Sequence, residues 1–173
     1  MKFAVISDSH GFTDNVKRLA DRLVRAGIKL AVHLGDEYED AEPLLAAGLE
    51  VSRVPGVFSP VYQDPDIPNR LLTSLGGLKV LLTHAEAPHQ NDRPEDGDPA
   101  EIASREKPDL VLFGHSHVPV IEERAGVWWV NPGHLKPEDK KGFPPSYALV
   151  DAGLRPIGIR ILALEGDRVM MER

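Results

Sequence analysis

The stretch Asp109-Leu-Val-Leu-Phe-Gly-His-Ser-His-Val118 decides the fold. Its four consecutive apolar residues, Leu110 to Phe113, are typical of a short strand that is buried on both faces. Gly114 ends this run, and His115 and His117 follow with one residue between them. Because side chains at positions i and i+2 of extended backbone point to the same side, both imidazoles can face one point beyond the strand. Taken alone, the stretch fits either a metal site at the carboxyl edge of an α/β sheet or a turn with two solvated histidines.

The same construction recurs at the ends of three more predicted strands. Apolar runs at residues 3–6, 29–34 and 78–83 each lead directly into candidate ligands. An amphipathic helix over residues 13–26 joins the first two runs, and strand, helix and strand in this order predict a parallel pair whose carboxyl ends meet at one edge. The side chains expected to converge there are Asp8, His10, Asp36, His84, His115 and His117.

These ligand types favour a pair of transition-metal ions. Nitrogen and carboxylate ligands without sulfur suit Mn²⁺, Fe, Zn²⁺ or Co²⁺ better than Ca²⁺ or Mg²⁺ alone. Six ligands exceed the need of one tetrahedral ion, so we expect two metals about 3.5–4 Å apart, with Asp36 as a bridge between them. Such a pair activates a hydroxide and holds phosphoryl oxygens, as hydrolysis of a phosphoester requires. His33, inside a strand, is expected to be a packed, hydrogen-bonded histidine instead of a ligand.

The remaining segments predict a second sheet stacked on the first. Gly76-Gly77 marks one hairpin, and residues 118–130 form another. We further expect a helix over residues 40–48 with Asp40 as its N-cap, and a mobile loop from Ala85 to Gly97 over the site. The other expected elements are a helix over residues 98–106 and closing strands at residues 147–151, 157–164 and 168–171.

Composition limits the class of protein. The 173 residues fit one domain, and 20 basic against 27 acidic residues give a net charge of −7, which argues against broad binding to nucleic acid or to an anionic membrane. The chain has no cysteine, and no apolar run is long enough to span a membrane, so we expect a cytoplasmic protein. The antiparallel edge strands and Trp128-Trp129 are compatible with a homodimer.

The motifs together resemble those of the calcineurin-like metallophosphoesterase superfamily. Asp-x-His-Gly at 8–11, Gly-Asp at 35–36, Thr-His at 83–84 and Gly-His-Ser-His at 114–117 follow in the order and spacing of that family. The nearest branch is that of small bacterial and archaeal phosphodiesterases, which share a fold with the small retromer subunit, and Asn131-Pro132-Gly133 also resembles it. The resemblance implies an α/β fold of two mixed sheets flanked by helices in αββα layers.

The resemblance further implies a dinuclear site, often supplied with Mn²⁺, with Fe, Zn²⁺, Co²⁺ or Ni²⁺ as alternatives. Asp36 would bridge the metals, and His115 or a water would lie near the leaving group, so Asp36 and His115 are the expected catalytic residues. The implied ligands are Asp8, His10, Asp36 and His117 for one metal, and Asp36, His84 and His115 for the other. The implied activity is hydrolysis of a phosphodiester or phosphomonoester.

One segment departs from the family pattern. Where the family has Gly-Asn-His-Asp or Gly-Asn-Cys-Asp, this chain has Gly56-Val57-Phe58-Ser59. Valine cannot ligate a metal, so the second site is expected to be weak, since even losses outside the ligand shell cost about 10–100-fold in affinity. His89 could offer a substitute ligand, but we favour a solvated loop histidine. His134, where the family commonly has Ser, either hydrogen-bonds a phosphate or caps a turn.

Two functions therefore stand. The first, which we favour, is a metal-dependent phosphoesterase that acts on a small phosphoester or nucleotide, with monoesters, diesters and cyclic nucleotides all open. The second is a catalytically degenerate binding or scaffold protein with the same fold, which the replacement at Val57 and Phe58 favours.

Overall fold

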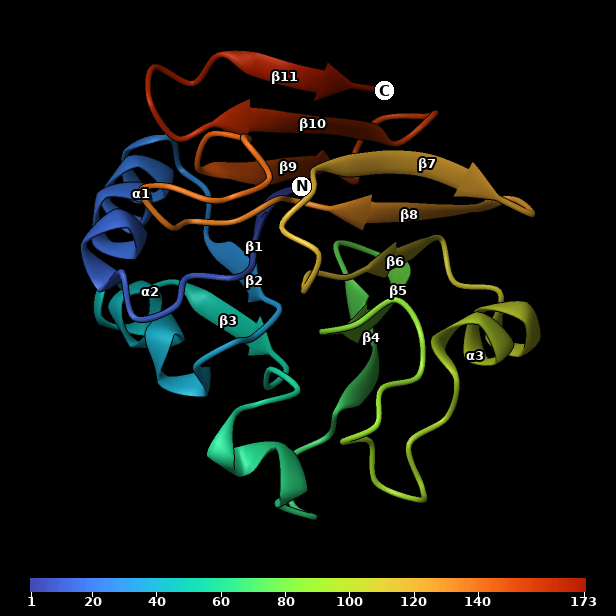
Figure 1. Ribbon diagram of the computed structural model, residues 1–173. Helices are drawn as coiled ribbons and strands as arrows, with labels where there is room; N and C mark the ends of the chain where they lie inside the picture. Colours follow the sequence, from blue (N-terminus) through green and yellow to red (C-terminus); the bar gives the residue numbers. More distant parts are fainter.

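Two mixed β-sheets packed face to face form the centre of the protein (Figure 1). The computed structural model describes residues 1–173. The first sheet has six strands in the order β11-β10-β9-β1-β2-β3, and the second has five in the order β4-β5-β6-β8-β7. The strands are β1 (Lys2–Ile6), β2 (Leu30–His33), β3 (Glu50–Arg53), β4 (Arg70–Leu75), β5 (Leu78–Thr83), β6 (Leu110–Leu112), β7 (Val120–Arg124), β8 (Val127–Asn131), β9 (Ser146–Asp151), β10 (Gly158–Ala163) and β11 (Val169–Glu172).

Each sheet contains three neighbouring parallel strands, and its other strands are antiparallel. In the first sheet β1, β2 and β3 are parallel, and in the second β5, β6 and β8 are parallel. Strands β9 to β11, β4 and β7 run antiparallel to their neighbours. Because the carboxyl ends of parallel strands share an edge, the loops that follow these six strands are the ones that can build a common site.

Helices cover the outer faces of both sheets, so the layers are helix, sheet, sheet and helix. Figure 1 shows α1 (Thr13–Arg25) and α2 (Glu42–Ala46) beside the first sheet, with α3 (Pro99–Glu106) on the other side of the molecule. The apolar stripe of α1, which includes Leu19 and Leu23, packs with Ile6 and other residues of the first sheet. These layers confirm the predicted αββα architecture. None of the helices is long and apolar enough to cross a lipid bilayer.

The main core fills the space between the sheets. Alternating residues of the central strands, such as Val5, Val32 and Val80, lie there without solvent exposure, because in a strand every second side chain faces the same sheet. Trp129 is buried on the other face of the second sheet, against Phe113, and Trp128 packs at the margin of the main core. Both tryptophans therefore contribute to packing.

The helix expected over residues 40–48 is present as α2 but is shorter, and its predicted N-cap was wrong. A 3₁₀ turn, η1 (Tyr38–Ala41), leads into α2, and the N-cap is Ala41 instead of Asp40. The Asp40 carboxylate accepts hydrogen bonds from Ser9 Oγ and Gly11 N, both at 2.7 Å, so it supports the loop after β1. A second 3₁₀ turn, η2 (Pro60–Gln63), lies between β3 and β4. The helix expected over residues 98–106 is confirmed as α3, and Asp98 caps it through Ala100 N at 2.7 Å.

Candidate metal centre

All six candidate ligands lie at the carboxyl edge shared by the two sheets. Asp8 and His10 follow β1, Asp36 follows β2, and His84 follows β5. The remaining pair, His115 and His117, follows β6. The sheets thus bring together residues that are more than 100 positions apart in the chain.

The turns that present these ligands require unusual backbone. Five of the six ligand residues have positive φ, a left-handed conformation that costs a residue with a side chain roughly 1–2 kcal/mol. Such conformations persist where the surroundings enforce them and are concentrated at functional sites. The φ angles are 55° at Asp8, 48° at His10, 69° at Asp36, 65° at His115 and 60° at His117.

Four of the ligands form a tight group, which we call the first cluster: Asp8, His10, Asp36 and His117. One ligand atom of each lies within 4.8 Å of those of the others. His10 Nε2 lies 3.0 Å from His117 Nε2 and 2.8 Å from Asp36 Oδ2, and His117 Nε2 lies 3.3 Å from Asp8 Oδ1. Two imidazole nitrogens and two carboxylates therefore face one point.

Asp36 connects this group to a second cluster, which consists of Asp36, His84 and His115. Its Oδ1 lies 3.7 Å from His84 Nε2, and His115 Nδ1 lies 3.3 Å from the same His84 nitrogen. Asp36 Oδ2 is buried, and no donor other than the His10 ring, 2.8 Å away, reaches it. A buried carboxylate oxygen whose neighbour is another candidate ligand is well satisfied by a cation, so Asp36 fits a metal-bridging role.

Hydrogen bonds on the far side of two imidazoles fix which nitrogen faces the site. His84 Nδ1 donates to Leu34 O at 2.7 Å, which leaves the lone pair of Nε2 toward Asp36. His117 Nδ1 lies 2.7 Å from Asp139 Oδ2, so Nδ1 is the donor and Nε2 faces Asp8. A carboxylate behind a histidine in this way orients the ring and raises its basicity as a ligand.

The charges of the site shift several pKa values. The hydrogen bond to Asp8, supported by Asp139, raises the pKa of His117 to about 9. Burial alone would raise the pKa of Asp8, but its hydrogen bond with His117 and the charge of His84 lower it below its ordinary value. The pKa of His115 is lowered, by burial first and then by the charge of His84.

A buried network holds the loop that carries Asp8 and His10. Ser9 Oγ lies 3.1 Å from His33 Nε2 and donates to Asp40. His33 has no solvent exposure, and burial lowers its pKa to about 4. The prediction that His33 is packed and hydrogen-bonded is therefore confirmed.

The segment that departs from the family pattern lies against the second cluster. Gly56 N donates to Asp36 O at 3.1 Å, and a methyl group on Gly56 would collide with the backbone of Asp36. Val57 is 2% exposed and packs with Tyr62 and Ala85. An apolar side chain thus occupies the position where the resemblance implies a ligand.

Other residues support the ligands from outside the two clusters. Asp139 was missed in the sequence, because it lies in a charged loop without periodicity and its contact with His117 spans 22 positions. His134, for which the sequence left a phosphate hydrogen bond or a turn cap open, is fully buried; its Nε2 lies 3.0 Å from Phe143 O, and its ring lies 5.6 Å from that of His117. Asn131 Nδ2 donates to Gly114 O at 2.8 Å and fixes the turn before His115.

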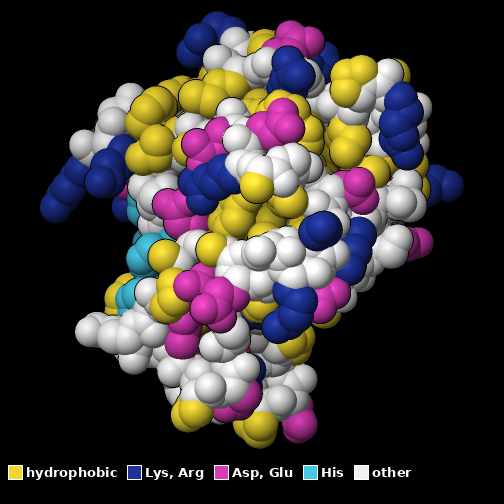
Figure 2. Space-filling view, turned by 90° about the vertical axis from the view of Figure 1, so that its right-hand side faces the viewer, with side chains coloured by type: hydrophobic (Ala, Val, Ile, Leu, Met, Phe, Trp, Pro, Cys, Tyr) yellow, Lys and Arg dark blue, Asp and Glu magenta, His cyan; other side chains and the backbone are white.

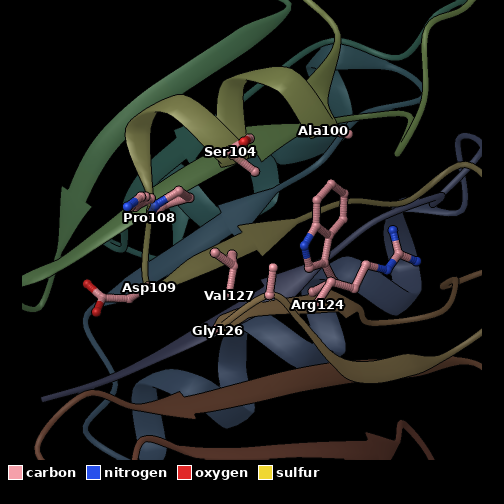
Figure 3. A pocket seen from close by; sticks show the side chains of 11 residues that line it. Ala100, Ser104, Pro108, Asp109, Arg124, Gly126 and Val127 are labelled. Carbon is pink, nitrogen blue, oxygen red and sulfur yellow. The ribbon is translucent and has the colours of Figure 1, made fainter.

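A separate hollow of about 510 Å³ lies between α3 and the β7–β8 hairpin, at the amino end of β6 (Figure 3). Two of its polar side chains already have partners, since Asp109 accepts from Lys79 N at 2.8 Å and Arg124 pairs with Glu86. Figure 2 looks onto this side of the molecule and shows histidines at the left margin, while apolar, acidic and basic side chains mix over the rest. We assign no chemistry to this hollow.

Comparison with known proteins places these features in context. A family model, the calcineurin-like phosphoesterase superfamily domain, matches residues 1–153. The probable metallophosphoesterase YsnB of Bacillus subtilis (strain 168) is 30% identical over 138 residues, which are 79% of this chain and 76% of that protein. Phosphodiesterase YfcE of Escherichia coli (strain K12) is 24% identical over an alignment of 192 positions that covers 99% of this chain and 97% of that protein.

Solved structures share the whole fold. The Escherichia coli phosphoesterase Yfce superimposes with a TM-score of 0.71 at 22% identity, covering 100% of this chain and 98% of that one. Vps29 of Entamoeba histolytica in complex with Zn²⁺ gives a TM-score of 0.70 at 20% identity, again covering 100% and 98%. The same architecture therefore occurs in phosphoesterases and in Vps29 proteins.

Proposed function

The chain belongs to the calcineurin-like phosphoesterase superfamily, and from this premise we propose that it is a metal-dependent phosphoesterase with a dinuclear site. The proposal assigns one metal to the first cluster and the other to the second, with Asp36 shared between them. It makes Asp36 and His115 the catalytic residues, the first as the bridge and the second beside the leaving group.

The observation that carries the proposal is the environment of Asp36. Its buried Oδ2 lies 2.8 Å from His10 Nε2 and its Oδ1 lies 3.7 Å from His84 Nε2, so the groups that face its two oxygens are imidazole nitrogens of the two clusters. A carboxylate that served only the fold would satisfy both oxygens with donors. Two cations, one on each side, would satisfy them equally well.

The residues of the chain would act by binding and orientation. Two divalent metals supply Lewis acidity and water activation for phosphoryl transfer. Asp139 and Leu34 O keep the nitrogens of His117 and His84 aimed into the site. Asp8 accepts the backbone N–H of His115 at 2.9 Å, which ties the loop after β6 to the loop after β1. These contacts set the ligand positions before any metal binds.

The finer details of the proposal draw on similarity. We propose a phosphodiester as the substrate because an aligned relative of nearly full length is named a phosphodiesterase. Mn²⁺ is the proposed metal, in line with a site of imidazoles and carboxylates without sulfur. We further propose that the protein is cytoplasmic, because the chain has no cysteine, and that it forms a homodimer.

The test is a calorimetric titration of metal-free protein with Mn²⁺, with hydrolysis of bis(p-nitrophenyl) phosphate followed at each stage. We expect two metals per chain, with turnover rising as the second binds. Lys17→Ala, a change on the exposed face of α1, is the control and should alter neither result. One metal and no turnover at saturating Mn²⁺ would reject the enzyme.

A second candidate function follows from Val57. Because this apolar side chain stands where the resemblance implies an Asn ligand, a binding or scaffold protein with a singly occupied site is the alternative. Some proteins with this fold are Vps29 proteins, and one of them binds Zn²⁺ in its solved structure. The one-metal outcome of the titration would favour this alternative.

A further inference from the structure

His89, which belongs to neither ligand cluster, lies beside the second one. Its ring is centred 5.6 Å from that of His115, with 76° between the two ring planes. The exposed ring of Phe58 is centred 5.3 Å from that of His89, at 87°, and 6.3 Å from that of His115, so the three rings form a cluster. His89 lies in a loop, as expected, but it is half-buried against two aromatic rings of the site and is therefore less solvated than the sequence predicted.

A buried ion pair holds the loop that carries His89. The backbone N–H of His89 donates to Asp92 Oδ2 at 2.8 Å, and the same oxygen lies 3.0 Å from Arg70 Nη2. The side chains of Arg70 and Asp92 are 5% and 12% exposed, and Tyr62 also donates to Asp92. The loop expected to be mobile is thus anchored to β4 and η2 at the residues that place His89.

The protonation of His89 follows from its neighbour. The backbone N–H of Asn91 donates to His89 Nδ1 at 3.1 Å, and Asn91 Nδ2 donates to Val57 O at 2.9 Å. Because Nδ1 accepts a hydrogen bond, the proton of the neutral imidazole lies on Nε2. Nε2 is then a donor without a free lone pair, so His89 is unsuited to replace the missing metal ligand near Val57.

We propose that His89 is a substrate-contact residue, whose Nε2–H donates a hydrogen bond to a phosphoryl oxygen of the ester held at the second cluster. The inference rests on the proposed function. A neutral imidazole donor stabilises negative charge that develops on such an oxygen, and it transfers no proton in doing so. The edge-to-face contacts with Phe58 and His115 hold the imidazole beside the second cluster, where such an oxygen would lie.

The test compares wild type with His89→Ala and His89→Gln. Three quantities are measured: Mn²⁺ stoichiometry by calorimetry on metal-free protein and then, at saturating Mn²⁺, the Kd for inorganic phosphate and kcat/KM for bis(p-nitrophenyl) phosphate. In His89→Ala we expect an unchanged metal count and a loss of about 10- to 100-fold in phosphate affinity and in kcat/KM, as for a hydrogen bond to a charged group. His89→Gln should recover part of both, because its amide can donate.

Glu86→Ala is the matched control, because Glu86 lies on the same loop and pairs with the exposed Arg124; it should leave all three quantities unchanged. Should His89→Ala fail to fold, His89→Phe keeps an aromatic ring against Phe58 without a donor, and it should show the same losses. Wild-type phosphate affinity in the folded variants would overturn the inference. Loss of a bound metal in His89→Ala would also overturn it, because His89 would then be a ligand. A wild-type protein that binds one metal and shows no turnover would instead reject the proposed function itself.

Discussion

Metal binding at the first cluster should tighten steeply as the pH rises, because His117 holds a proton that a metal must displace. In the metal-free protein the hydrogen bond to Asp8 and the contact with Asp139 raise the pKa of His117 to about 9. A metal takes only the neutral imidazole, so below that pH each binding event releases one proton. The ordinary pKa of histidine is about 6.5, and binding would then release almost no proton at pH 8.

The two cases differ by a large factor. With a pKa of about 9, the neutral fraction of His117 rises about 80-fold between pH 6.5 and pH 8.5, whereas with the ordinary pKa it rises only about twofold. We therefore expect the apparent affinity for the first Mn²⁺ to rise by the larger factor. His115 adds little to this dependence, because its pKa is lowered.

Calorimetry in buffers of different ionisation enthalpy measures both the affinity and the number of protons released. The variant Asp139→Asn tests the cause, because it removes the carboxylate 2.7 Å from His117 Nδ1. Its metal affinity should fall by about 10–100-fold at pH 8.5, where orientation of the ring dominates. The loss should be smaller at pH 6.5, because the variant also lowers the pKa of His117 and hence the competition from protons. An affinity that changes only twofold across this range in the wild type would refute the reasoning.

Three further predictions concern metal content and stability. Asp36→Ala should abolish binding at both clusters, which elemental analysis can check, and two retained metals would disprove the bridge. The metal-free protein should lose stability between pH 7 and pH 9.5, because the pKa of His117 is higher in the folded than in the unfolded protein. The contribution of His117 to the free energy of unfolding, of order 3 kcal/mol, is complete below about pH 6.5 and is lost as the pH rises through about 9. A flat unfolding midpoint over this range would contradict that sign. Gly114→Ala should destabilise the fold by roughly 1–3 kcal/mol in denaturant titrations and weaken metal binding, because the added methyl group would collide with Ser7 Oγ and the Asp8 carboxylate. Wild-type stability of this variant would show that the turn can rearrange to accept the methyl group.

The fold and the ligands were largely predictable because both depend on local patterns. Short apolar runs such as residues 3–6 and 110–113 mark buried strands, and the structure places strands at both. Since parallel strands align their carboxyl ends, the residues after them had to meet, and the structure brings Asp8, Asp36 and His115 to one edge. The helix over residues 98–106 was also predictable, because Asp98 is a typical N-cap and Pro99 after it is typical of a first helical position.

The supporting residues were not predictable, because their roles depend on contacts between distant loops. Asp40 looks like an N-cap in the sequence, but its carboxylate turns to Ser9, 31 positions away. Asp139 is one charge among several in an irregular loop. The position of His89 depends on the buried pair of Arg70 and Asp92, which no periodicity reveals. Sequence patterns indicate which residues face the site, whereas packing decides which of their neighbours hold them in place.

The left-handed backbone at five of the six ligand residues sets thermal stability against metal binding. Glycine adopts positive φ without steric cost, so replacing one of these ligands by glycine would relieve local strain of about 1–2 kcal/mol while removing a metal contact. At any of these positions where the strain exceeds the interactions that the side chain makes, a selection for heat resistance without added metal would enrich variants that no longer bind it. Improvement of this protein for use at high temperature should select on bound metal as well as on survival, and should leave Asp8, His10, Asp36, His115 and His117 unchanged.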